Sequence, residues 1–373
     1  MNQRFYSLDV FRGATVCLMI LVNNPGNWGH IYDPLDHAPW HGLTPTDLVF
    51  PFFLFAVGNA LSFVIPRLQA AGDGAFWKKV ITRTLIIYAV GLFLTWWPFV
   101  RWVGNHLEFR DWVDPKNHML GVRTLGVLAR IAISYFFASI IIYYTKSKMA
   151  FYISMLILLA YWALCFLKGD PSDPYSMNGF FGNQVDRDVL GVAHMYKGEG
   201  IPFDPEGLMS TMNAIVQVIF GYLVGEYIQK KGKNFEMISG LFVAGVAMLV
   251  TGFCWDMVFP INKKIWTSSY TIYTTGMATI TIATMIYLIE FKNVKGWLSK
   301  FFDVFGKNAL FVFALSAFLP KTLALIRIPD HINDKGKMVY TNPWNWLYQK
   351  VLVKIPGDPR LGSLLYALCV ITL

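Results

Sequence analysis

The sequence predicts an all-α membrane protein, a polytopic bundle of about ten to eleven transmembrane helices with a small outer cap of loops. Of its 373 residues, 55% are hydrophobic and only 15% are charged, whereas about 25% of the residues of an ordinary soluble protein are charged. Its 13 Trp and 18 Tyr are typical of the aromatic belts at membrane interfaces. The apolar residues fall into runs close to the roughly 20 residues that cross a bilayer.

Nine apolar runs are predicted to be membrane-crossing helices. A further run begins near Leu361, and we expect it to be a last helix that is cut short at Leu373, because it is too short to cross a bilayer. The aromatic stretch 342–353 is expected to be an interfacial helix or the start of another span. We expect residues 1–373 to form a single transmembrane domain. The nine runs occupy residues 9–22, 48–64, 80–97, 124–144, 150–167, 208–228, 237–259, 268–289 and 308–326.

Basic residues between these runs predict the orientation. When the N-terminus is placed in the cytoplasm, each gap on that side carries lysine or arginine, while the gap that contains His37 carries neither. This distribution follows the positive-inside rule. We therefore expect a multi-pass protein of the inner, cytoplasmic membrane with a cytoplasmic N-terminus. The outer gaps 99–123 and 168–207 are longer and mixed in charge, and they predict the cap of loops.

The formal net charge of +9 does not indicate a nucleic-acid partner. The basic residues lie in short gaps between apolar runs, and they do not form one continuous basic surface. The expected partner of this charge pattern is the lipid bilayer.

The segment from His37 to Asp47 indicates chemistry at the outer boundary of the second span. Imidazole and carboxylate groups are costly near hydrocarbon, so their presence there points to catalysis or transport. A histidine paired with an aspartate forms a general base with a fixed tautomer. A metal site would need a third ligand, for which His30 and Asp36 are available, but we expect no metal. The alternative is that both histidines, His37 and His41, only occupy an outer vestibule.

Several cations within or beside the spans predict an anion-binding site. Arg123 and Arg130 are seven residues apart, which places them on one helix face about 10 Å apart along the axis. An arginine inside a span is costly against lipid, and its guanidinium group suits phosphate or carboxylate. The alternative is internal ion pairing with Asp256, Glu226 or Glu290.

Polar residues also gather at the ends of other spans. Asn23 ends the first span, Asn213 lies within the sixth, Tyr270 opens the eighth, and Asn308 opens the ninth. Such residues can cap helix ends or contact a polar substrate.

Together these blocks resemble the heparan-α-glucosaminide N-acetyltransferase family and its bacterial relatives. The resemblance extends over nearly the whole chain in the same order, through residues 7–13, 37–51, 122–130, 203–213 and 260–270. It implies a polytopic membrane enzyme that takes acetyl from cytosolic acetyl-CoA and places it on the amine of a terminal glucosamine on the far side. The family's active histidine matches His37, and its asparagine at the end of the first span matches Asn23. This chain has His41 where the lysosomal enzyme has a different residue.

The sequence thus predicts an acetyl-CoA-dependent transmembrane acyltransferase with an amino-sugar acceptor. One rival is a secondary transporter of a sugar or acid with a His/Asp proton relay, but no inverted repeat is visible. Another is an O-acyltransferase of a surface glycan. The sequence allows a homodimer without requiring one. The predicted catalytic residues are His37, Asn23 and Asp47, the predicted acceptor contacts are His41, Trp40, Asn213 and Tyr270, and the predicted donor contacts are Arg12, Arg83, Arg130, Lys307 and Asn308.

Overall fold

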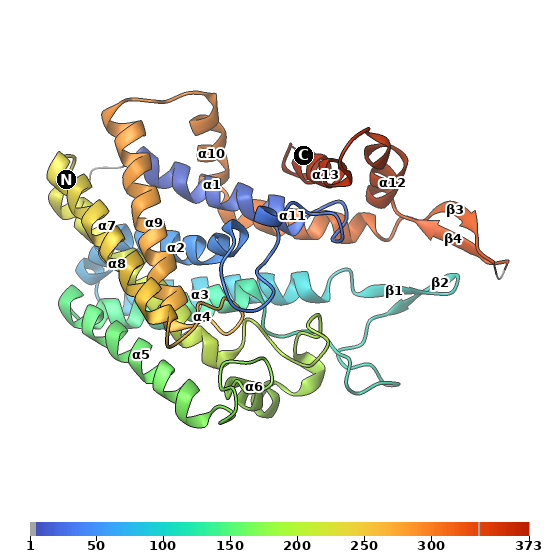
Figure 1. Cartoon of the computed structure of the whole chain (residues 1–373), viewed down its shortest axis with the longest axis horizontal. Coiled ribbons are helices and arrows are strands. Elements are labelled where there is room, and N and C mark those ends of the chain that lie inside the picture. The colour runs from blue at the N-terminus through green and yellow to red at the C-terminus, as the bar shows by residue number, and fades with distance from the viewer. Residues whose placement is uncertain (1–4, 335, 373) are drawn as a thin grey trace.

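Long apolar helices make up most of the computed structural model, which describes residues 5–334 and 336–372 (Figure 1). Eight of these helices match the first eight predicted spans, with ends that differ by a few residues. The π-helical turn η4 (Tyr287–Phe291) extends the last of them. The eight are α1 (Tyr6–Asn23), α2 (Val49–Ala71), α3 (Asp73–Trp96), α4 (Val127–Tyr144), α5 (Ser147–Lys168), α7 (Leu208–Lys231), α8 (Phe235–Asp256) and α9 (Ser268–Ile286).

The ninth predicted span, 308–326, corresponds to the second helix of a bent pair, whose first helix was not predicted. α10 (Trp297–Lys307) and α11 (Ala309–Leu323) meet at Asn308 and differ in direction by 84°. By length and composition, eight helices of the described residues could cross a membrane, or up to nine if this pair counts as one span.

Two short helices lie in the C-terminal segments that raised the predicted number of spans to ten or eleven. α12 (Pro343–Lys350) and α13 (Pro359–Thr372) are too short to cross a bilayer. α13 packs at the C-terminal end of α1, where the Asn27 backbone nitrogen donates to Ser363 Oγ at 3.1 Å. The predicted all-α polytopic bundle is therefore confirmed, and α12 and α13 lie close to the two C-terminal stretches that the sequence marked.

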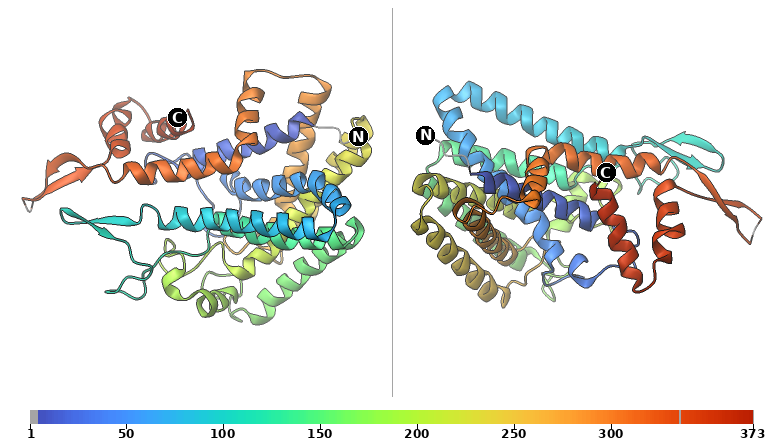
Figure 2. Two further views of the ribbon diagram at one scale, coloured as in Figure 1. Left: turned by 180° about the vertical axis from the view of Figure 1, so that it is seen from behind. Right: turned by 90° about the horizontal axis from the view of Figure 1, so that it is seen from above.

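The connections expected as outer loops contain further secondary structure. β1 (Val100–Val103) pairs with β2 (His106–Phe109), and β3 (Ile328–Ile332) pairs with β4 (Met338–Thr341), both antiparallel. Both hairpins project from the same end of the bundle (Figures 1 and 2). The remaining elements are α6 (Gly182–Leu190) and the 3₁₀ turns η1 (Asp33–Leu35), η2 (Pro45–Leu48), η3 (Val192–His194) and η5 (Leu352–Lys354).

The centre of the bundle is formed by α2, α7 and α9. In the most apolar stretch of α2 and of α7, two-thirds of the residues are buried, whereas in that of α3 only 17% are buried. Most of the surface of α3 is therefore left to contact lipid. α9 contains six threonines, and each of them donates its hydroxyl to the carbonyl four residues earlier. These bonds satisfy the hydroxyls within a helix that has few polar neighbours.

Glycines allow α1 and α10 to touch through their backbones. A Cβ atom on Gly13 would lie 1.7 Å from the Phe302 carbonyl oxygen, and one on Gly306 would lie 2.0 Å from the Asp9 carbonyl oxygen. No side chain fits at either position without separating the two helices. This close approach allows Arg12 Nε to donate to the Gly306 carbonyl at 2.6 Å, which fixes Arg12 beside the bend between α10 and α11.

Candidate active site

The structure places His37 and Asp47 in direct contact, as the sequence predicted. His37 Nδ1 lies 2.7 Å from Asp47 Oδ1. Asp47 is buried and His37 is part-exposed, with 38% of its side chain accessible. If His37 Nδ1 carries the proton and donates it to Asp47, then Nε2 is left with its lone pair as a base or nucleophile.

The turn before α2 holds the Asp47 carboxylate. Thr44 precedes the 3₁₀ turn η2, and its backbone nitrogen and hydroxyl both donate to Asp47 Oδ2 at 3.1 Å. The backbone nitrogen of Ala38 donates to the same oxygen at 3.1 Å. This reciprocal capping arrangement folds the segment of His37 back over the start of α2, so the sequence spacing of ten residues becomes a contact.

Lys263 is the third charged group at this contact. Its Nζ lies 3.4 Å from Asp47 Oδ1 and 3.0 Å from His37 Nδ1. Burial lowers the pKa of Lys263, against the opposing influence of Asp47 and Glu206, which favour the charged form. Lys263 lies between α8 and α9, in the block 260–270 that resembles the family, but the sequence did not single it out as a site residue.

A cavity of about 220 Å³ opens beside these three side chains. Two carboxylates and two further cations line it, together with aromatic rings that can pack against the apolar face of a sugar. The cavity is therefore suited to a small polar molecule with an amine. Its lining residues are His37, Ala38, Trp40, Asp47, Arg123, Val127, Tyr196, Glu199, Pro205, Glu206, Lys263, Lys264 and Trp266.

The carboxylates of this cavity are held by ion pairs. Arg123 binds Asp204 and also pairs with Glu206, and Lys264 Nζ lies 2.6 Å from Glu199 Oε2. Burial opposes the charge on Arg123, but the ion pairs with Glu206 and Asp204 prevail and raise its pKa. Because Glu206 lines the cavity with a cation already bound, it is positioned to accept a hydrogen bond from a ligand without bearing an uncompensated charge.

Of the predicted acceptor contacts, Trp40 lines the cavity. Its indole Nε1 donates to the Tyr175 carbonyl at 3.0 Å, and its ring packs against Phe203 with the centroids 5.5 Å apart. Trp40 thus forms part of the cavity wall that the segment 37–44 contributes.

The other predicted acceptor contacts, with Asn23, lie outside this cavity. Tyr270 is buried and donates its hydroxyl to the Asp47 carbonyl at 2.6 Å, while Asn213 donates to the Trp266 carbonyl at 2.8 Å. Both hold the backbone that carries the site. His41 has an exposed side chain whose Nδ1 lies 3.4 Å from the Asn262 amide. The part of its ring that is shielded from water lowers its pKa, against the opposing influence of Asp173 and Asp256. Asn23 is exposed at the end of α1.

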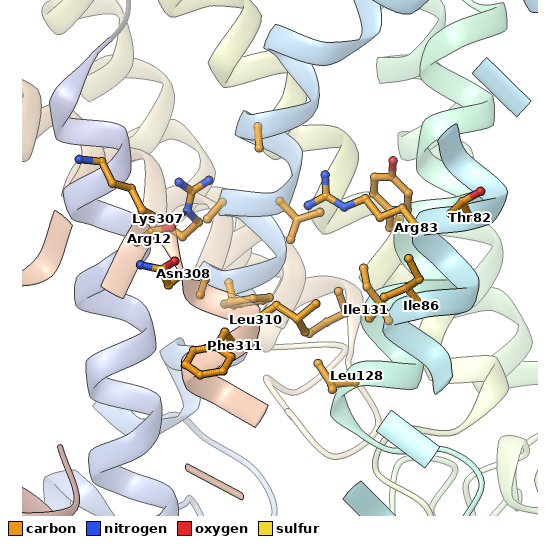
Figure 3. Close-up of a pocket in the computed structure, with 18 of the residues that line it drawn as sticks. Arg12, Thr82, Arg83, Ile86, Leu128, Ile131, Lys307, Asn308, Leu310 and Phe311 are labelled. Carbon is orange, nitrogen blue, oxygen red and sulfur yellow. Dashed lines mark hydrogen bonds between the residues drawn. The ribbon is translucent and has the colours of Figure 1, made fainter. Parts of the chain in front are cut away.

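A second cavity, of about 640 Å³, contains four of the five predicted donor contacts: Arg12, Arg83, Lys307 and Asn308. Figure 3 shows Arg12, Arg83 and Lys307 toward one end and Leu128 and Phe311 toward the other. Arg12 is paired with Asp9 and Lys307 with Asp303. Among the described residues Arg83 has no carboxylate partner, and it lies against the ring of Tyr135, 5.1 Å from its centroid.

Arg130 does not join the other predicted donor contacts. It lies in the first turn of α4, fully buried, and contacts the Gly207 carbonyl and the Ser210 hydroxyl. Its guanidinium group lies over the Trp266 ring, 4.9 Å from the centroid. The prediction assigned Arg130 to the cytoplasmic half. α4 begins beside the cavity of His37, which Val127 lines, so Arg130 lies at that end of the bundle and apart from the other four residues.

The two cavities approach each other at the start of α4. Val127 lines the smaller cavity, while the next residue, Leu128, and then Ile131 line the larger one. Asp47, just before α2, lines the smaller cavity, and Phe53, in the first turns of α2, lines the larger one. Between them Phe50 packs edge-on against Trp266, with the ring centroids 5.1 Å apart. The side chains of Phe50 and Trp266 thus lie between these parts of the two cavities.

Sequence reasoning missed several residues of both cavities. Lys79, Thr82 and Tyr135 line the larger cavity, and Tyr196 and Glu199 line the smaller one. Lys79 was recognised only as a basic residue between spans, and the others lie in no recognisable motif. In the part of the chain that the structure describes, no three His, Cys, Asp or Glu side chains are grouped to hold a metal ion.

Comparison with known proteins identifies the relationship. The chain is 25% identical to heparan-alpha-glucosaminide N-acetyltransferase of Homo sapiens over 373 aligned positions, which cover 83% of this chain and 52% of that protein. The Mus musculus protein of the same name is also 25% identical, over 83% of this chain and 53% of its own length. The chain thus spans about half the length of these curated relatives. No protein-family model matches it. The chain is a distant relative of the heparan-alpha-glucosaminide N-acetyltransferases.

Proposed function

We propose that this protein transfers an acetyl group from acetyl-CoA, bound in the larger cavity, to the amine of an amino sugar, bound in the smaller cavity. The observation that carries the proposal is that two consecutive residues, Val127 and Leu128, line the two different cavities, with His37 in the smaller one. The names of the relatives support an N-acetyltransferase with a glucosamine-like acceptor. The chain is proposed to lie in the inner membrane of a cell with its N-terminus in the cytoplasm, as the basic residues indicate.

The larger cavity suits CoA in both charge and shape. Arg12, Arg83 and Lys307 offer charge-assisted hydrogen bonds to phosphate oxygens, and the apolar side chains farther in suit the uncharged pantetheine arm. Half of the hydrocarbon core is about 15 Å thick, which an extended arm can span. The thioester would then reach the end of the cavity near Leu128 while the nucleotide stays at the charged end.

In the smaller cavity, the chain's own residues supply the chemistry of acetyl transfer. The Asp47 carboxylate orients His37, whose Nε2 takes a proton from the attacking amine or attacks the thioester itself. The carboxylates of Glu206 and Glu199 offer hydrogen-bond acceptors for a substrate amine or hydroxyl. Trp40 and Tyr196 offer flat faces for a sugar ring.

The proposal is tested by incubating the purified protein in detergent with acetyl-CoA and glucosamine. We expect acceptor-dependent release of free CoA and formation of N-acetylglucosamine, with galactosamine and muramic acid as comparison amines. Release of CoA with a glycan hydroxyl as the only acceptor would support an O-acyltransferase instead. Absence of any CoA release with every acceptor would contradict the proposal.

Removing Arg83 is expected to weaken donor binding. Arg83→Ala should raise the dissociation constant of acetyl-CoA by about 10- to 100-fold, because a hydrogen bond to a charged group contributes roughly 1.5–3 kcal/mol. The measurement is isothermal titration of the purified variant with acetyl-CoA. Lys148→Ala is the matched control, since this basic residue begins the neighbouring helix α5 but does not line the cavity. An unchanged dissociation constant in Arg83→Ala would place the donor phosphates elsewhere.

A further inference from the structure

The position of Lys263 over the imidazole of His37 calls for a physical explanation. Lys263 Nζ lies 3.0 Å from Nδ1 and 3.3 Å from Nε2. An atom that is almost equally close to both ring nitrogens must lie above the face of the ring. In the plane of the ring, an atom at these distances would overlap with Cε1, the carbon between the two nitrogens. The ammonium group therefore does not block the lone pair of Nε2, which lies in the plane of the ring. A reacting atom can still approach Nε2 along that direction.

The segment that carries Lys263 is built to hold this side chain in place. The Asn262 side chain accepts a hydrogen bond from the Ile265 backbone nitrogen at 3.0 Å, and its backbone nitrogen donates to Thr267 Oγ1 at 3.0 Å. Trp266 adopts a φ of +50°, which is unfavourable for a tryptophan. The Ile261 carbonyl accepts from the Gly42 backbone nitrogen at 2.8 Å, which ties this segment to that of His37.

The neighbouring lysine provides a contrast. Lys264 points to a different partner, since its Nζ lies 2.6 Å from Glu199 and above the ring of Trp40. Two consecutive lysines thus line one cavity, but only Lys263 contacts His37 and Asp47. The contact with His37 and Asp47 is therefore specific to Lys263 and does not follow from a basic segment in general.

We propose that Lys263 is a positioning residue of this site, whose ammonium group pairs with the buried Asp47 carboxylate and keeps the His37 imidazole neutral. A cation 3.0–3.3 Å from both ring nitrogens disfavours a second positive charge on the ring. His37 then donates its Nδ1 proton toward Asp47 and keeps the lone pair of Nε2. The catalytic role of that lone pair rests on the proposed acetyl transfer, whereas the effect of Lys263 on the imidazole does not.

Other charged groups near the ring do not supply this effect. The Asp36 side chain accepts from the His37 backbone nitrogen at 2.8 Å, and Asp47 favours a charged ring through its contact with Nδ1. Each of the remaining charged groups of the cavity has an oppositely charged partner other than His37. The charged and titratable groups that face His37 are Asp36, Asp47, Arg123, Glu199, Glu206, Lys263 and Lys264, with His41 on the same segment.

The test measures the state of His37 without using acetyl-CoA. Diethylpyrocarbonate modifies neutral imidazole, and mass spectrometry of the peptide that contains His37 gives the extent of modification as a function of pH. In Lys263→Met we expect the midpoint of this curve to lie about one pH unit above that of the unmodified protein. Lys263→Arg, which retains the charge, should restore most of the original midpoint. Lys264→Met, which removes a charge from the same segment, should shift it by less than half as much.

Two further readouts separate the possible outcomes. Thermal unfolding establishes that Lys263→Met is folded, which we expect because Asp47 keeps its bonds to Ala38, Thr44 and His37. On the acidic side of its pH profile, the acetyl-transfer rate should fall at a higher pH in Lys263→Met. This shift in pH should equal the shift in the midpoint of the modification curve. A folded Lys263→Met variant with an unmoved curve would overturn the inference. A shifted curve in a protein that transfers no acetyl would support the role of Lys263 and overturn the proposed function.

Discussion

Replacing His37 with alanine is expected to abolish most acetyl transfer while leaving the fold intact. The loss should be at least ~10²-fold, the low end for removal of a general base. A nucleophilic role would make the loss larger, because no other imidazole in the described chain lines this cavity. The measurement is single-turnover transfer from labelled acetyl-CoA to glucosamine, with thermal unfolding as a test of the fold. Binding of acetyl-CoA should be unchanged, since His37 does not line the larger cavity.

His41→Ala is the matched control for this prediction. His41 lies on the same segment but is exposed and contacts Asn262. If it contacts the acceptor, its removal should mainly raise the acceptor's KM, as expected for loss of uniform binding. An inactive His41→Ala with an active His37→Ala would reverse the assignment. Trapping labelled acetyl on the protein without acceptor would favour an acetyl-histidine intermediate over direct attack.

Asp47→Asn is expected to give the second large effect. An amide at this position can donate a hydrogen bond to His37 Nδ1, and this would favour the tautomer that carries its proton on Nε2. Lys263 would also lose the partner of its buried charge. We expect kcat to fall by about 10²- to 10⁴-fold and the free energy of unfolding to fall by about 1–3 kcal/mol.

The two consequences of Asp47→Asn are measured separately, by single-turnover transfer and by chemical unfolding. Asp33→Asn is the control, because Asp33 lies on the same outer segment with 95% of its side chain exposed. It should leave both quantities within experimental error of the unmodified protein. Near-normal transfer by a folded Asp47→Asn variant would exclude a role for the carboxylate in orienting His37.

The helices of this fold could be predicted from sequence because the bilayer imposes a length and a composition on each of them. All eight long helices were found, with ends displaced by a few residues. The bend at Asn308 was not, because α10 contains three charged residues and resembles a polar connection. Its strongly one-sided pattern is visible only once its apolar face is known to pack against α1. The hairpins were missed for a similar reason, since their strands are only four or five residues long.

The site was predictable where contacts are local and less so where they join distant segments. His37 and Asp47 are ten residues apart, and their chemistry indicates a pair. Lys263 reaches them from the turn between α8 and α9, more than 200 residues later, and no local pattern distinguishes it from Lys264. Arg130 was placed in the wrong half for a different reason. The arginine itself was recognised, but the direction of its helix was not applied to it.

Sealed vesicles test most directly the central claim, that an acetyl group crosses the membrane between the two cavities while CoA does not. The purified protein is reconstituted with glucosamine inside, and acetyl-CoA labelled separately on the acetyl group and the adenine is added outside. We predict labelled N-acetylglucosamine inside the vesicles, with the adenine label remaining outside. With His37→Ala the adenine label should also remain outside, but no labelled product should form. Product formed only when donor and acceptor share one side of the membrane would contradict the account.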